Sequence, residues 1–264
     1  MGRPARLVVV ALLVTTLVPA LALAKPKNTP RYSPPQNGNG GRIDIQQYYL
    51  IDDPKEAARI LLEESKLAQV DIDQRWGGTA RNEIRLGSGS MVPNTKDKRF
   101  FELAAKRVAA SDGEQETICV IKCNRVLTIR EIAEMMNQGI RIYRGAPFDA
   151  LFARVPASAA QYLREFDAVD WVGEFTPEMK YDTNATFSPD GACQVLSLVG
   201  DAAQCRRDLE RLGGKVVGTG GTGEMHYRYF TYVVTIPKDR VPEVASLWWV
   251  QEIYQYGRAV SEGG

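Results

Sequence analysis

The chain has 264 residues, of which 25% are charged, and its formal net charge is +1. Loss of an N-terminal leader containing Arg3 and Arg6 reduces the 33 basic residues to 31, against 32 acidic ones. This near balance argues against a nucleic-acid partner, because binding to a phosphate backbone favours a concentrated basic patch.

Residues 1–24 are predicted to be a secretory signal peptide. Arg3 and Arg6 precede an apolar run from Leu7 to about Val18, and Ala22-Leu23-Ala24 supplies a small-residue cleavage motif. The run is short for a membrane span, although an uncleaved anchor helix is the alternative. We therefore expect an exported protein, periplasmic or extracellular, without membrane association after cleavage.

The next two segments are a linker and a helical N-terminal region. Residues 25–42 are rich in Pro, Gly and Asn, a composition typical of a disordered linker. Within residues 43–115, apolar side chains at helical spacing predict helices over 54–70 and 99–110, with a loop over 75–97. We assign no function to this region.

The remainder of the chain is predicted to be a tandem repeat of about 65 residues per copy. Pro156 and Pro237 have the same separation as several pairs of apolar residues around them. Cys119 and Cys193 have a shorter separation, which places an insertion in the second copy around Gly218–Tyr227. The two copies occupy residues 116–181 and 191–258.

Each copy is predicted to have the element order β-α-β-β-α-β. The first copy has expected strands at 118–123, 140–143, 150–155 and 169–175, with helices from Thr128 to Gly139 and over 157–166. The second has expected strands at 193–199, 215–218, 228–236 and 250–256, with helices over 203–212 and 238–247. Thr128 and Glu131 form a capping-box pattern. The order predicts an α+β fold with two ferredoxin-like sandwiches, in which two helices cover one face of a four-stranded antiparallel sheet.

Strand alternation then predicts which side chains occupy the uncovered sheet faces. In the first copy these are Phe152, Trp171 and Phe175, an apolar patch that requires a cover. The second copy is more polar, with Val233, Glu252, Tyr254 and Tyr256 at comparable positions. The patch is covered either by the N-terminal helices or the sister repeat, or by another protein.

Two stretches of the first copy carry a family resemblance. Residues 169–180 form a V-x-W-V-G-E-F-x-P-x-x-K segment, and residues 139–156 form the hairpin before it. Together they resemble the propeptide and inhibitor-like domains that precede subtilisin-type serine protease domains in exported bacterial and archaeal precursors. The resemblance covers roughly residues 116–258, in two copies.

The resemblance implies a subtilisin-type serine protease as partner. In that family the open sheet face packs on two surface helices of the protease and the C-terminal tail lies in the substrate cleft, so the domains act as inhibitors and folding chaperones. The segments 176–181 and 256–262 are the implied tails. The implied partner-binding residues are Phe152, Trp171, Phe175, Tyr254, Tyr256 and Val260.

The chain is not predicted to be a protease itself. The Asp-Thr/Ser-Gly, His-Gly-Thr and Gly-Thr-Ser-Met-Ala motifs are absent, and the single histidine, His226, lies in the inserted hairpin. We therefore expect a non-enzymatic protein without catalytic residues. Two alternatives are the pro-region of a truncated or split protease precursor, and a structural or interaction module with no protease partner.

No cofactor or metal is expected either. The glycine-rich run 218–223 matches G-x-G-x-x-G, but a strand rather than a helix is predicted after it, which favours a hairpin over a nucleotide site. No His/Cys spacing fits zinc. Four cysteines in an exported chain allow three disulfide pairings, among which a Cys119–Cys193 bond remains open.

Overall fold

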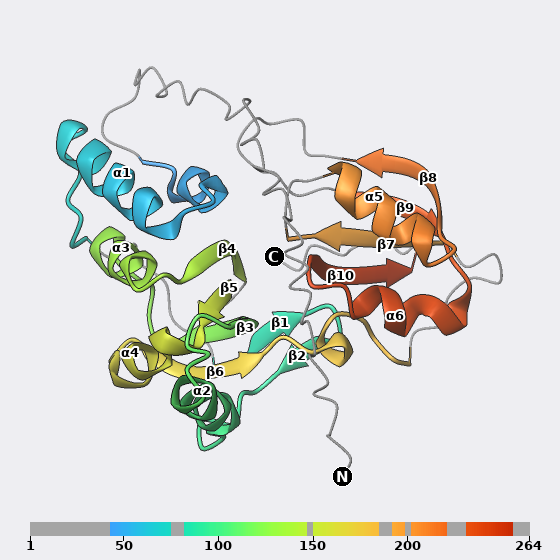
Figure 1. Cartoon of the computed structure of the whole chain (residues 1–264). Coiled ribbons are helices and arrows are strands. Elements are labelled where there is room, and N and C mark those ends of the chain that lie inside the picture. Colours follow the sequence, from blue (N-terminus) through green and yellow to red (C-terminus); the bar gives the residue numbers. More distant parts are fainter. Residues whose placement is uncertain are drawn as a thin grey trace, which may run out of the picture. The chain divides into compact units, whose positions relative to one another are not determined.

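The computed structural model describes residues 43–74, 82–146, 150–184, 192–198, 202–220 and 231–255 (Figure 1). These residues form an α+β fold with two four-stranded antiparallel sheets and one two-stranded hairpin. The predicted leader and linker at 1–24 and 25–42 lie outside the described residues. No helix of the described part has the length and apolarity needed to cross a membrane.

The N-terminal region contains a hairpin as well as helices. Its elements are η1 (Ile45–Leu50), α1 (Pro54–Leu67), β1 (Ile84–Leu86), β2 (Gly89–Met91) and α2 (Arg99–Ala109). The two predicted helices are confirmed; α1 begins at Pro54 because the Asp53 side chain accepts a hydrogen bond from the Lys55 backbone. The prediction that 75–97 is only loop was wrong, because β1 and β2 pair around the turn Gly87-Ser88.

The first sheet follows. Its segment consists of β3 (Glu116–Cys123), α3 (Ile129–Asn137), β4 (Arg141–Ala146), β5 (Ala150–Pro156), η2 (Ala157–Ala159), α4 (Ala160–Glu165), β6 (Val169–Glu174) and η3 (Pro177–Met179). The predicted capping box is confirmed: Thr128 and Glu131 each accept a hydrogen bond from the other's backbone. Gly139 has a φ of +82°, which lets the chain turn after α3 into β4. The strand order is β4-β5-β3-β6.

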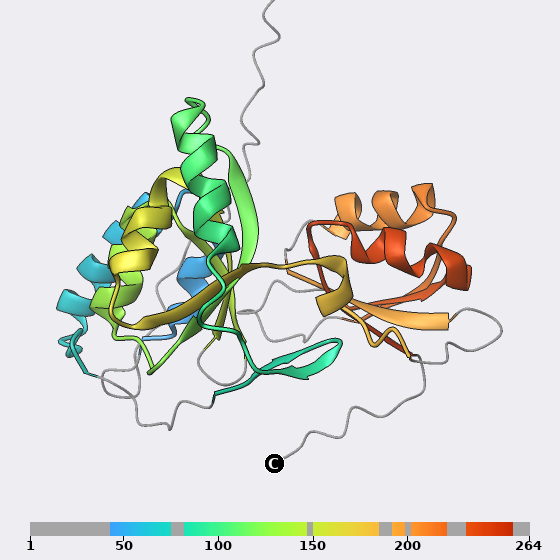
Figure 2. The same ribbon diagram turned by 90° about the horizontal axis from the view of Figure 1, so that it is seen from below.

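The second sheet repeats this arrangement. Its segment consists of β7 (Ala192–Ser197), α5 (Ala202–Arg211), β8 (Lys215–Gly220), β9 (Thr231–Thr235), η4 (Lys238–Arg240), α6 (Val241–Ala245) and β10 (Val250–Gln255). The strand order is β10-β7-β9-β8. Counted within its own segment, each sheet therefore has its strands in the order fourth, first, third, second. Figure 2 shows α5 and α6 together on one face of the second sheet.

The predicted strand faces are confirmed by the cores. Ala153, Val155 and Val172 face a core shared with α1, α3 and α4. Tyr232 and Val234 face the equivalent core of the second sheet, with Ile253. A third apolar cluster lies on the opposite face of the first sheet, and it contains the three aromatic residues that the sequence placed there.

Candidate functional site

The aromatic patch of the first sheet is buried by the chain itself. Phe152, Trp171 and Phe175 are 0%, 6% and 5% exposed, and the rings of Phe152 and Phe175 lie 4.9 Å apart. Ile84 and Leu86 of β1 pack in the same cluster, with Leu198 from the end of β7. The expectation that these three aromatics form an accessible docking face is therefore wrong for this conformation. The alternative of an internal cover is correct, but the N-terminal part of the cover is a hairpin rather than helices.

Trp171 folds back along its own strand. A Cβ placed on Gly173 lies 2.1 Å from Cζ2 of Trp171, so the indole occupies the space in which any other side chain at position 173 would begin. The side chains of residues two positions apart on a strand point to the same face. A tryptophan on the face that carries the hairpin therefore requires a glycine two residues later.

The hairpin turn also contacts the segment that joins the two sheets. Ser88 N–H donates to Met179 O over 3.2 Å, and a Cβ on Gly87 falls only 2.3 Å from Lys180 O. The Lys180 ammonium is itself buried, with a residue exposure of 2%. It donates to Leu247 O at 2.9 Å and lies 5.0 Å from the centre of the Phe175 ring. Burial lowers the pKa of Lys180 to about 8.

The equivalent face of the second sheet is more accessible. Val233, Glu252 and Tyr254 point away from the helix-facing core and are half-buried. Tyr254 pairs with Gln194 of β7, another half-buried residue on this face. Tyr256 and Val260, the other two predicted partner-binding residues, lie outside the described residues.

Glu252 gives this face a pH dependence. Burial raises the pKa of Glu252 to about 7, against the opposing effect of the Arg144 and Arg85 guanidinium groups. The folded chain therefore holds a proton that the unfolded chain releases near pH 4.5, and stability is lost as the pH rises through 7. Relative to a Glu252→Gln variant, the wild type should lose about 1–2 kcal/mol between pH 5 and pH 8, after allowance for the partly exposed side chain. Urea unfolding of both proteins at pH 5 and pH 8 measures this change. If wild type and Glu252→Gln differed in free energy of unfolding by the same amount at both pH values, the burial of Glu252 would be contradicted.

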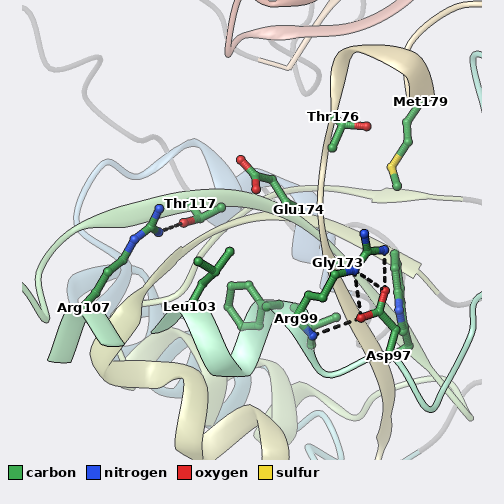
Figure 3. Close-up of a pocket in the computed structure, with 12 residues that line it drawn as sticks. Asp97, Arg99, Leu103, Arg107, Thr117, Gly173, Glu174, Thr176 and Met179 are labelled. Atoms are coloured by element: carbon green, nitrogen blue, oxygen red, sulfur yellow. Dashed lines mark hydrogen bonds and ion pairs between the residues drawn. The ribbon is translucent and has the colours of Figure 1, made fainter. Parts of the chain in front are cut away.

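A pocket with a volume of about 210 Å³ lies beside β6 (Figure 3). Phe100, Leu103 and Arg107 of α2 form one wall, and β6 from Trp171 to Glu174 forms the other. Two of its polar contacts are internal: Asp97 and Arg99 form an ion pair at 2.6 Å, and Arg107 donates to Thr117 Oγ1. Sequence reasoning did not find this pocket, because it depends on how α2 packs beside the last strand of the sheet.

The described residues offer little for metal or thiol chemistry. No group of three or more His, Cys, Asp or Glu side chains in the described part could hold a metal ion. The four cysteines are buried thiols, so the Cys119–Cys193 bond that the sequence left open is not formed. Burial raises the pKa of both Cys119 and Cys193, which disfavours the reactive thiolate. His226 and residues 221–223 of the glycine-rich run lie outside the described residues.

The chain was also compared with known proteins. No protein-family model, no curated protein sequence and no solved structure matches it.

Proposed function

We propose that the chain is an exported, non-enzymatic protein with two ferredoxin-like, propeptide-like repeats, which binds a subtilisin-type serine protease through the second repeat. On this proposal the second sheet face, with Val233 and Tyr254, docks on the protease. The residues after β10, including Tyr256 and Val260, enter the substrate cleft. The complex either inhibits the protease or assists its folding.

The observation that supports the second repeat over the first is the difference between the two sheet faces. Phe152, Trp171 and Phe175 are buried under β1 and Leu198, so the first face has no room for a partner in this conformation. On the second face, Val233 and Tyr254 remain half-buried. The strand β10 also runs directly into the C-terminal segment, the geometry that a docking face with a following tail requires. The first repeat then acts as a scaffold.

Titration of residues 25–264 against a subtilisin-type protease tests the proposal, with hydrolysis of a small peptide substrate as the readout. We expect saturable inhibition. Val233→Glu and Tyr254→Asp should each raise the inhibition constant at least about tenfold, or about 1.4 kcal/mol, because each buries a charge in the docking face. Deletion of residues 256–264 should weaken inhibition further.

Val108→Glu is the matched control. Val108 lies on α2, is 49% exposed and precedes the second repeat in the sequence. Like Val233, it is a valine replaced by glutamate. It should leave the inhibition constant unchanged. If the folded wild type does not inhibit, and also fails to raise the yield of active protease on refolding, the proposal is wrong and an interaction module without a protease partner takes its place.

A further inference from the structure

We propose that the outer edge of β6, with the adjoining pocket beside α2, binds an extended peptide as an added strand, with a basic side chain of the peptide opposite Glu174. This site lies in the first repeat. It goes beyond the proposed protease docking through the second repeat and does not depend on it.

The backbone of β6 carries the first part of the argument. β6 is the last strand in the order β4-β5-β3-β6, and among the described residues its only strand partner is β3. Phe175 N–H donates to Ile118 O at 2.8 Å, which marks that pair as hydrogen-bonded. Bonded and non-bonded pairs alternate in an antiparallel ladder, so the N–H and C=O of Val172 and Glu174 point away from β3. These are the groups to which an added strand bonds.

The pocket carries the second part. It runs along the same stretch of β6, and Phe100 and Leu103 give its α2 wall an apolar surface. Leu103 is 46% exposed there, although it is a large apolar side chain. Figure 3 shows Leu103 from the helix and Gly173 and Glu174 from the strand around one space. A strand added at this edge can therefore place an apolar side chain opposite Val172, on the face that carries Leu103, while its backbone pairs with β6.

Charge selects the kind of peptide. Asp97 and Arg99 neutralise each other. Arg107 keeps its charge but donates to Thr117 on β3, the strand inside β6, rather than toward the outer edge. Glu174 is exposed and forms no ion pair with any residue of the described ranges. Opposite charges on directly facing strand positions attract, so a lysine or arginine opposite Glu174 is favoured over an acidic residue. The occupant that fits is an extended peptide of apolar and basic residues.

Fluorescence anisotropy with labelled peptides tests this in the full mature chain. The probe is a valine peptide with arginine at every fourth position, so that an arginine can face Glu174 while the valine two residues away faces Val172 on the side of α2. Its partner probe has glutamate in place of arginine. We expect saturable binding of the arginine probe and at least tenfold weaker binding of the glutamate probe. Glu174→Lys should weaken the arginine probe at least tenfold, and Glu174→Gln about threefold. Glu102→Lys, the same charge change at an exposed position on α2, should leave affinity within twofold.

Backbone pairing has its own readout. When the peptide adds antiparallel to β6, the residues facing Val172 and Glu174 must donate from their N–H groups. N-methylation of the arginines should therefore abolish binding, while N-methylation of the two valines that flank each arginine should not. Equal binding of both methylated peptides, or no saturable binding of the unmethylated probe, would overturn the proposal. So would a dimer in sedimentation that disappears in Glu174→Pro, because the edge would then belong to a second copy of the chain. Melting temperatures of the variants confirm that each is folded.

Discussion

Trp171→Ala is expected to lower the free energy of unfolding by about 3–5 kcal/mol, the range for removing a buried tryptophan. The indole is 6% exposed and sits between β6 and the covering hairpin, so truncation leaves a cavity under Ile84 and Leu86. A two-stranded hairpin is marginal by itself in water, so β1 and β2 depend on this packing. Chemical denaturation followed by circular dichroism measures the change. A docking residue on an open face would instead cost less than about 1 kcal/mol.

The control for this prediction is Trp248→Ala. Trp248 is 43% exposed and contacts Tyr143 and Arg154, so its truncation should lower the free energy of unfolding clearly less.

The contact between Trp171 and Gly173 gives a second check. Gly173→Ala alone should destabilise by about 1–3 kcal/mol, because its Cβ overlaps the indole. In the Trp171→Ala background the same change should cost much less, since the overlapping ring is absent. Additive effects would contradict the observed contact.

The faces of the strands were predictable because strand alternation depends on a strict period of two. The pairs Trp171/Val172 and Val233/Val234 were assigned to opposite faces from the sequence, and the cores confirm both assignments. The Thr128–Glu131 capping box could also be predicted from the sequence, because its two reciprocal hydrogen bonds join residues only three positions apart. In each case the determining interaction lies within a few residues along the chain.

The cover of the aromatic patch was not predicted, although a local signal for it existed. The alternating run Ile84-Arg85-Leu86 is followed by Gly87-Ser88, a dipeptide typical of a tight hairpin turn. That the hairpin packs on Trp171 depends on contacts distant in sequence. The burial of Lys180 is of the same kind: its acceptor, Leu247 O, is 67 residues away. The pocket beside β6 likewise requires the position of α2.

The two sheets thus share a strand order but differ in what their outer faces contact. In the first, aromatic residues and a glycine fit a hairpin that the same chain supplies. In the second, half-buried residues such as Val233 and Tyr254 leave the face without a comparable apolar cluster in the described part. With the outer face of the first sheet covered by β1 and Leu198, the second sheet is the one whose outer face remains partly accessible. On the function proposed above, docking therefore falls to the second sheet, although the family resemblance rests mainly on the first copy.

Lys180 should make stability rise with pH in the alkaline range. Its pKa is lowered to about 8 in the fold, while an unfolded lysine has a pKa of about 10.4. Between these values the unfolded chain binds the extra proton, so the free energy of unfolding increases with pH. The penalty of the buried charge is fully present below pH 8 and is relieved as the pH rises toward 10. Relative to Lys180→Met, the wild type should gain about 2–3 kcal/mol between pH 7 and pH 10.

The difference from Lys180→Met isolates this effect from buried tyrosines, whose influence has the opposite sign. Burial raises the pKa of Tyr162 to about 12, so that residue lowers stability as the pH passes 10 in wild type and variant alike. Lys106→Met, at an exposed position on α2, is the matched control. A difference between wild type and Lys180→Met that stays constant from pH 7 to pH 10 would mean that the ammonium is hydrated. The packing of Gly87 and Phe175 around Lys180 would then be looser than the contacts to Leu247 O and the ring indicate.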